Sequence, residues 1–297
     1  MDSINQMVIV GLGEVLWDML PDGKKIGGAP ANFAYHLSQC NFPTYLVSAV
    51  GADELGEQIR DTLSVAGLNV MLPVVEQPTG TVEVELDDKG VPQYNICENV
   101  AWDNIPFTPE IEALAKRTAT VCFGTLAQRS EQSRKTIEAF INAMPEEGVK
   151  VCDVNLRGNY YSKEVIEWSM RVSDVVKVNG EELVEICRVL GVEYTDQHLI
   201  ARDFIDQYKL EMFIVTCGTE GSFIYCEDQN ASCLPTPAVE VVDTVGAGDA
   251  FTAIFVAGML GGLEVRWAHM LAVEAAAYVC TQAGAMPILP DDIKDRI

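Results

Sequence analysis

Short apolar runs that suit buried strands alternate with helix-like stretches along most of this 297-residue chain. Strands are expected at residues 7–10, 45–50, 121–123, 151–153, 175–178 and 213–216. Helices are expected at residues 31–40, 54–66, 131–143, 164–171, 181–190 and 197–208. Because strands joined by helices pair in parallel and take helices on both faces, the order predicts an α/β fold with a mostly parallel central sheet. No linker or repeat interrupts it, so we expect one domain over residues 1–297.

Two segments depart from this alternation and read as antiparallel hairpins. Residues 79–86 alternate strictly between apolar and polar side chains, residues 87–90 (D-D-K-G) form a turn, and residues 91–96 return. Residues 15–26, with P-D-G in the middle, form the second candidate. The excursions at about 15–27 and 79–103 are expected to form a small β lid over a ligand site, although surface decoration is an alternative. Side chains of the second excursion are expected to face the ligand (Tyr94, Asn95, Asn99 and Trp102).

The charge balance argues against several classes of partner. The chain carries 44 acidic and 20 basic residues, a net charge of −24. A field of that sign repels phosphate backbones and anionic lipid, so neither nucleic acid nor a membrane is expected as a partner. The nine cysteines include no C-x-x-C pair, which argues against a disulfide framework or a zinc site. We expect a cytoplasmic protein with reduced thiols and neither a signal peptide nor a membrane span.

The most informative segment for chemistry covers residues 239–260. A β-branched run is expected to form a strand that ends at Asp243 and Thr244, followed by a V-G-A-G turn and a long apolar helix opened by Asp249. Glycines allow backbone N–H groups to approach a ligand closely, and a helix N-terminus favours anions. A carboxylate beside such N–H groups suits phosphoryl transfer to a hydroxyl. A helix cap at Asp249 after an ordinary tight turn is the alternative.

Two sequence signatures resemble those of a known family. The run D-T-V-G-A-G-D at 243–249 is similar to the C-terminal signature of the ribokinase-like (pfkB family) carbohydrate kinases. G-G-A-P-A-N at 27–32 and V-G-A-D-E-L-G at 50–56 resemble the N-terminal signature. Together with D-V-N-L-R at 153–157, they are most similar to fructokinases. The resemblance implies a ribokinase-like fold and an ATP-dependent transfer to a small sugar hydroxyl that uses Mg²⁺ and, in many members, a monovalent cation such as K⁺.

The resemblance also implies roles for individual residues. It makes Asp249 the catalytic base, and the anion hole would comprise Gly246, Ala247 and Gly248. On the sugar side it points to Asp18, Gly28 and Asn32. On the nucleotide side it points to Asn179 and Glu182 around Mg²⁺ and the phosphates, with Glu182 acting indirectly, and to the turn with Thr216, Gly218 and Gly221. Asp243, with carbonyls near residues 283–284, would hold the monovalent cation.

Arg157 and Lys177 are also candidate site residues, because of the chemistry expected at their positions. Several of the assigned residues have an ordinary structural explanation as well. Arg157 could offer positive charge to a phosphate or pair with a surface acid. Lys177 lies at a strand end, where active-site loops of parallel sheets occur. Asp18 could be a surface acid and Asn32 a residue at a helix start. Glu182 could simply be a favourable acid in a first helical turn.

Departures from the family pattern bear mainly on which sugar is used. The residues Cys40-Asn41 stand where Gly or Ser is usual, and Asn tolerates the left-handed backbone that a turn needs. Leu16 and Ala29 replace residues typical of ribokinases, which weakens a ribose assignment. Fructose is the first choice. A 2-keto-3-deoxy sugar acid, another hexose, a pentose or a nucleoside are alternatives, and a homodimer is left open.

Other function classes fit the sequence less well. Gly11-Leu12-Gly13 follows a strand as a dinucleotide-binding turn would, but Leu16 occupies the position of the next glycine. No G-x-x-x-x-G-K-[ST] loop of a Walker-type NTPase occurs. A non-catalytic sugar-binding protein on the same fold remains an alternative from another class.

Overall fold

A computed structural model describes residues 7–20, 23–86, 92–226 and 230–297 of the chain. Within these ranges nine strands form the main sheet in the order β15-β14-β13-β12-β11-β10-β1-β4-β6. Neighbours from β6 to β13 pair in parallel, and β14 and β15 extend this sheet antiparallel at one edge. The predicted mostly parallel α/β fold is therefore confirmed. The strands of the main sheet are β1 Val8–Leu12, β4 Thr44–Val47, β6 Asn69–Met71, β10 Thr118–Phe123, β11 Val149–Asp153, β12 Val175–Asn179, β13 Met212–Thr216, β14 Ser222–Cys226 and β15 Asn230–Leu234.

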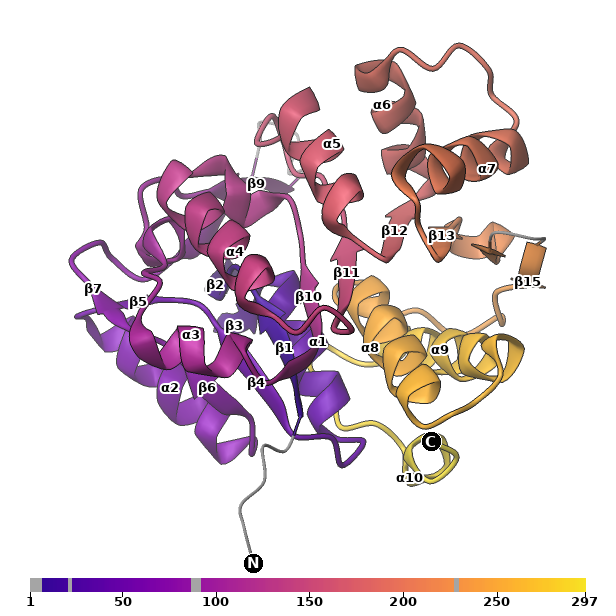
Figure 1. Ribbon diagram of the computed structural model, residues 1–297. Coiled ribbons are helices and arrows are strands. Elements are labelled where there is room, and N and C mark those ends of the chain that lie inside the picture. The colour runs from indigo at the N-terminus through magenta and orange to yellow at the C-terminus, as the bar shows by residue number, and fades with distance from the viewer. Residues whose placement is uncertain (1–6, 21–22, 87–91, 227–229) are drawn as a thin grey trace, which may run out of the picture.

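Helices cover both faces of this sheet because its central strands are apolar on both sides. In β1, Val8, Val10 and Leu12 belong to one core cluster, whereas Ile9 belongs to the other. The first cluster packs beneath α3 to α7, and the second packs beneath α1, α8, α9 and α10. Figure 1 shows α8 and α9 side by side in yellow. The helices are α1 Ala29–Ser38, α2 Glu54–Val65, α3 Pro109–Ala115, α4 Glu131–Ala143, α5 Lys163–Val172, α6 Gly180–Leu190, α7 Gln197–Tyr208, α8 Ala247–Leu260, α9 Val265–Cys280 and α10 Asp291–Lys294, with short 3₁₀ turns η1 Ala101–Asn104, η2 Leu126–Arg129 and η3 Gly218–Glu220.

The two excursions form strands of one small sheet. Its order is β3-β2-β8-β9 among the described residues, with bounds β2 Leu16–Leu20, β3 Gly23–Gly27, β8 Thr81–Leu86 and β9 Pro92–Ile96. Both predicted hairpins are antiparallel pairs, and β2 joins them by pairing in parallel with β8. The predicted turn at 87–90, residues 21–22 and the side chain of Tyr94 lie outside the described residues. A third pair joins β5 Val50–Gly51 to β7 Val74–Val75.

Two local features that the sequence predicts, the cap of α2 and the turn after α1, are present in the structure. Asp53 caps α2 by accepting a hydrogen bond from Gly56 N at 2.8 Å. Asn41 adopts a left-handed backbone with φ 62°, as expected for the turn after α1. The expectation for Trp102 is wrong, because its side chain is fully buried and the Arg129 guanidinium lies 4.0 Å from its ring. Burial of this large aromatic ring in the core stabilises the folded protein more than a half-exposed position facing a ligand would.

The strand expected before Thr244 is also wrong. Residues 239–244 form no strand, and Val239, Val241 and Val242 are exposed. The backbone N–H groups of Val242 and Asp243 donate to Cys280 O at the end of α9, at 2.8 and 3.3 Å. Strand propensity depends on a pairing partner, and here the chain is attached to a helix end instead.

Candidate active site

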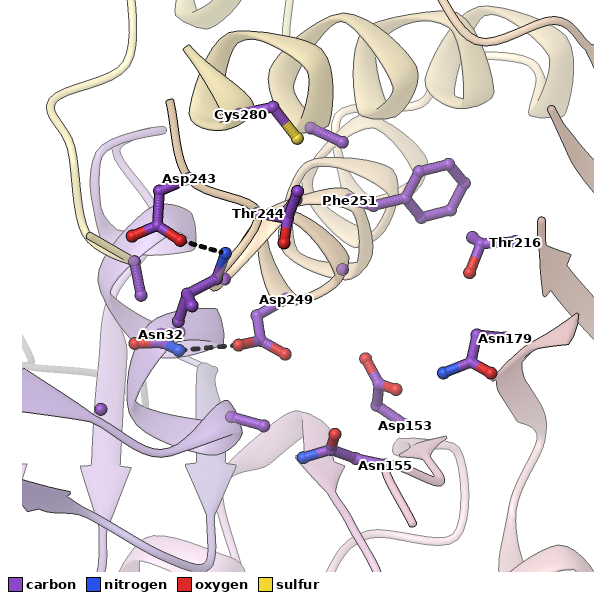
Figure 2. A pocket seen from close by; sticks show the side chains of 18 of the residues that line it. Asn32, Asp153, Asn155, Asn179, Thr216, Asp243, Thr244, Asp249, Phe251 and Cys280 are labelled. Carbon is purple, nitrogen blue, oxygen red and sulfur yellow. Dashed lines mark hydrogen bonds between the residues drawn. The ribbon is translucent and has the colours of Figure 1, made fainter. Parts of the chain in front are cut away.

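A cavity of about 1040 Å³ opens at the carboxyl ends of the parallel strands. Asp153, Asn179 and Thr216 end β11, β12 and β13, and all three line it. Ligands of open parallel sheets bind at this edge, because loops from several strands converge there. The small sheet contributes Asp18, Val82 and Ile96 to the wall, and α8 points its N-terminus into the cavity. Figure 2 shows Asp249 and Asp153 pointing into the same space, with Asn179 and Thr216 beyond them.

The N-terminus of α8 is built so that backbone can approach a ligand. Gly246 is the N-cap with φ 79°, and a Cβ there would lie 2.6 to 2.8 Å from atoms of Ala285. Only glycine fits this conformation and this contact. The helix begins at Ala247, so Asp249 is its third residue and not the opening one. In the first turn of this helix Ala247 N donates to Thr244 O at 3.3 Å and Ala250 N donates to Gly246 O at 2.9 Å, which leaves the N–H groups of Gly248 and Asp249 for an anion.

Asp249 does not cap its own helix, so the alternative of a simple cap is excluded. Its Oδ2 accepts a hydrogen bond of 2.7 Å from Asn32 Nδ2, on α1 (Figure 2). Burial and the neighbouring Asp153 raise the pKa of Asp249 to about 6, while Lys177, Asn32 and Arg157 oppose that rise. Such a carboxylate is ionised near neutral pH and can still accept a proton readily, as a general base must.

Lys177 brings a buried positive charge to the same helix end. Its Nζ donates to both oxygens of Asp153 at 3.1 and 2.9 Å, and Thr252 Oγ1 donates to Asp153 Oδ2 at 2.8 Å. A Cβ on Gly248 would lie 3.0 Å from this Nζ, so the missing side chain leaves room for the ammonium group. The acids Asp153 and Asp249 raise the pKa of Lys177 despite its burial, and the group stays charged. An anion at the α8 N-terminus would therefore meet a fixed cation.

Asn179 and Glu182 form a capping box at the start of α6. Asn179 Oδ1 accepts from Glu182 N, and Glu182 Oε2 accepts from Asn179 N, both at 2.8 Å. Glu182 Oε1 accepts from Leu156 N at 3.0 Å, so the carboxylate also holds the loop after β11. The ordinary reading of Glu182 as a first-turn acid is thus correct. Because both of its oxygens are already bonded to backbone, any action on a metal would be indirect.

The far end of the cavity is an apolar slot beside a glycine turn. Gly218 is the first residue of η3 and Gly221 follows its last residue, and their φ values are 53° and 111°. A Cβ on Gly221 would lie 2.5 Å from Leu234 O, so this turn requires glycine. The opposite wall is apolar and comes from α8, α9 and the segment before α8 (Val239, Val241, Phe251, Val273, Ala276, Ala277 and Cys280). A flat, largely apolar group fits between such walls.

The near end, below the small sheet, carries acids and two basic side chains. Asp18 lies over Gly27, where a Cβ would approach its Oδ2 to 2.4 Å. Burial and the nearby Asp243 raise the pKa of Asp18 to about 6. Gly28 has φ 109°, and a Cβ at this position would lie 2.4 Å from Glu14 O. Asn32 follows in the first turn of α1, which begins earlier than expected, at Ala29. Arg157 and Lys25 also line this end.

Asp243 is held in place by two backbone groups. Its Oδ1 accepts from Val245 N and its Oδ2 from Gly284 N, both at 3.1 Å. The bond from Gly284 joins the segment before α8 to the loop after α9. Both bonds orient the carboxylate beside the α8 N-terminus without occupying every lone pair.

Every residue expected to have a catalytic, sugar-binding, nucleotide-binding or cation-binding role lines this one cavity, whereas Asn95, Asn99 and Trp102, which were expected to face the ligand, do not line it. Sequence reasoning missed Glu14, Asp153 and Asn155, which also line it. Asp153 is the last residue of the apolar strand β11, and Glu14 lies two residues beyond the end of β1. Their places at the carboxyl ends of strands could have identified them. Asn155 has a left-handed backbone with φ 47°, which the D-V-N-L-R run alone does not reveal. No cluster of three or more His, Cys, Asp or Glu side chains suited to a metal occurs among the described residues.

Comparison with known proteins agrees with this geometry. Residues 22–292 match the family described as pfkB family carbohydrate kinase. The chain belongs to this family. It is therefore an ATP-dependent carbohydrate kinase, as the sequence predicts.

Individual relatives are similar over nearly their whole length. A protein named fructokinase from Klebsiella pneumoniae is 29% identical over 95% of this chain and 97% of its own. A protein named ATP-dependent 6-phosphofructokinase from Thermoanaerobacterium thermosaccharolyticum is 26% identical over 95% of this chain and 91% of its own. The solved structure of a fructokinase from Xylella fastidiosa with bound ATP superposes with a TM-score of 0.86, covers 98% of both chains and is 19% identical. The last likeness confirms the ribokinase-like fold.

Within the part of the chain that the structure describes, no helix combines the length and the apolar character needed to cross a bilayer.

Proposed function

We propose that this kinase transfers the γ-phosphoryl group of ATP to a hydroxyl group of a neutral sugar, with fructose as the first choice. One observation supports this most: the Asp249 carboxylate, the Lys177 ammonium group and the N-terminus of α8 border a single cavity. Phosphoryl transfer needs a carboxylate to take the hydroxyl proton and fixed positive charge to stabilise the migrating group. These are the groups present.

The cavity accommodates the two substrates end to end. The apolar slot along α9 suits the adenine ring, and the glycine turn at Gly218 and Gly221 leaves room beside it for ribose and phosphates. The γ-phosphate would then lie at the first turn of α8, beside Lys177. The sugar would lie between Asp249 and the small sheet, within reach of Asp18 and Asn32.

Mg²⁺ fits this site as a companion of the ATP phosphates. Mg²⁺ usually keeps several waters and binds through few carboxylates plus substrate phosphates. Asp153 and Glu182 line the cavity near the proposed phosphate position, and their existing bonds leave room for contact through water. When bound, Mg²⁺ neutralises negative charge on the phosphates. A K⁺ site at Asp243 and the loop after α9 is part of the same proposal.

The acceptor end favours a neutral sugar over a sugar acid. Glu14, Asp18 and Asp249 border it, and desolvation already raises the pKa of each. A carboxylate on the substrate would be repelled by the negative charges of Asp18 and Asp249, although Arg157 and Lys25 would offset part of this repulsion. Carboxylates accept hydrogen bonds from the hydroxyl groups of a polyol, which suits fructose or another neutral hexose.

The small sheet is proposed to act as a lid that closes over the sugar. Asp18 on β2 and the apolar Val82 and Ile96 on β8 and β9 already face the cavity. Closure would exclude water, which limits hydrolysis of ATP without transfer. Cytoplasmic location belongs to the same proposal and is supported by nine free cysteine thiols. The homodimer stays a prediction.

A substrate panel tests the proposal directly. ADP release is measured with fructose, other hexoses, a pentose, a 2-keto-3-deoxy sugar acid, a nucleoside and fructose 6-phosphate, the last because one relative is named a phosphofructokinase. Fructose is expected to give the highest kcat/KM. Sugar binding without ADP release would instead support the non-catalytic sugar-binding protein, and a preference for another acceptor would overturn the fructose assignment alone.

Replacement of Asp18 by alanine is expected to weaken sugar binding more than turnover. The side chain accepts hydroxyl hydrogen bonds in the proposed complex, and loss of a charged acceptor costs about 1.5–3 kcal/mol, or about 10- to 100-fold in sugar KM. Steady-state kinetics with varied sugar at saturating ATP measure this. An unchanged sugar KM would remove Asp18 from the acceptor site.

Turnover is expected to fall as the pH drops through about 6, the value to which burial raises the pKa of Asp249. Below that pH the carboxyl group is protonated and cannot accept the hydroxyl proton, whereas above it the group is ionised and competent. A profile of kcat against pH, with sugar and ATP saturating at each point, tests this. A flat profile from pH 5 to about 7 would contradict the role of Asp249 as base.

A further inference from the structure

Glu14 is a buried acid in the cavity wall that the proposed reaction has not used. It follows β1, it is 2% exposed, and it lines the cavity near the first turn of α1. Its Oε1 accepts a hydrogen bond of 3.2 Å from Ala29 N, the first residue of that helix. Its Oε2 is buried and has no hydrogen-bond partner among the described residues. A carboxylate oxygen in that state carries a large desolvation cost.

Asn32, in the first turn of α1, also has a buried side-chain oxygen without a hydrogen-bond donor among the described residues. Its Nδ2 donates to Asp249 Oδ2 at 2.7 Å, and an ionised Asp249 requires this orientation of the amide. Its Oδ1 is then directed away from Asp249, as Figure 2 shows, and this oxygen is also buried without a hydrogen-bond partner. Ala29, which Glu14 contacts, and Asn32 are three residues apart on α1 and therefore lie in one turn.

We infer that the Glu14 carboxyl group donates a hydrogen bond from Oε2 to Asn32 Oδ1 and thereby positions the amide group that holds the catalytic base Asp249. The chain of bonds runs Glu14 to Asn32 to Asp249. It satisfies both buried oxygens with one proton. Glu14 is thus a positioning residue that acts through Asn32, and the inference rests on the proposed role of Asp249.

The surroundings of Glu14 favour the protonated form that this bond requires. Burial raises its pKa to about 7, and Asp249 contributes to the rise. The backbone N–H groups of Glu14 itself and of Ala29, and the charge of Arg157, act in the opposite direction and lower this pKa. The proton belongs on Oε2, since Oε1 already accepts from Ala29 N. An ionised Glu14 would leave Asn32 Oδ1 without a donor and would add a negative charge near Asp249.

Two substitutions at Glu14 separate positioning from mere packing. In Glu14→Gln, the amide can still accept from Ala29 N and donate to Asn32 Oδ1, so kcat is expected to stay within about 3-fold of wild type. In Glu14→Leu, both bonds are lost at similar volume, and kcat is expected to fall about 10- to 100-fold, the range seen when a supporting hydrogen bond is removed. Gln128→Leu is the matched control, because it removes a buried polar side chain bonded to Ser169 away from the cavity.

The pH dependence gives a readout that a structural role would not change. Wild-type kcat is expected to decline as the pH rises through about 7, where Glu14 loses its proton. Glu14→Gln cannot ionise and is expected to lack that decline, whereas the fall at low pH caused by Asp249 should remain. Both profiles are recorded with the full-length enzyme at saturating sugar and ATP.

The outcomes distinguish this inference from the proposed function. If Asp249→Asn is inactive while Glu14→Leu keeps wild-type kcat, only the inference fails. If Glu14→Leu does not fold, the comparison of wild type with Glu14→Gln still decides, because equal alkaline profiles or a turnover loss beyond about 3-fold in Glu14→Gln would overturn the inference. Wild-type turnover in Asp249→Asn would instead remove Asp249 as the base, the proposed role on which the inference rests.

Discussion

Substitution of Asp249 by asparagine is expected to lower kcat by about 10²–10⁴-fold while sugar affinity changes little. The amide keeps the size of the side chain and can still accept a hydrogen bond from Asn32, but it cannot take the proton of the acceptor hydroxyl group. Stopped-time assays of ADP release give kcat, and calorimetric titration with the sugar gives the dissociation constant. A loss confined to kcat would identify a group that acts in the transition state.

Asp61→Asn provides a matched control for this experiment. Asp61 lies exposed on α2, so the same change of charge there should leave turnover unchanged. If Asp249→Asn turns over at the wild-type rate, Asp249 is not the base. If sugar affinity and kcat fall together, its main role is binding the acceptor.

Substitution of Lys177 by methionine is expected to lower kcat by about 10²–10³-fold, comparable to the loss of one strong donor to a transition-state charge. The Nζ atom lies next to Gly248 at the start of α8, where the migrating phosphoryl group would collect negative charge. The same change leaves Asp153 buried without its cationic partner, which costs about 3–5 kcal/mol in the free energy of unfolding. Turnover and stability must therefore be measured together.

The double variant Lys177→Met/Asp153→Asn separates these two effects. Asparagine removes the unpaired buried charge, so the free energy of unfolding, measured by urea titration, should recover much of the loss. Turnover should remain low, because the cation at the helix N-terminus is still absent. Recovery of kcat along with stability would show that Lys177 only maintains the fold at this edge of the sheet.

Local patterns sufficed for the fold because each strand and helix signal agreed with its neighbours. The apolar run of β1 predicted a strand buried on both faces, and Asp53 predicted the start of α2. The strand expected at 239–244 failed because strand propensity counts only where a partner strand exists. The prediction that Trp102 faces the ligand failed because nothing in the local sequence distinguishes an aromatic ring that faces a ligand from one that fills the core.

By itself, the sequence determined the order of the elements, the glycine positions and the family signatures. These depend on neighbouring residues, whose periodicity and backbone preferences can be read along the chain. Only the tertiary structure decided that Asn32 reaches Asp249 across 217 positions of sequence and that Lys177 bonds Asp153 beside Gly248. The role inferred for Glu14 likewise could be found only from the tertiary structure. The burial of this residue, its free oxygen and its pKa arise from parts of the chain that meet only when the sheet edge, α1 and α8 pack together.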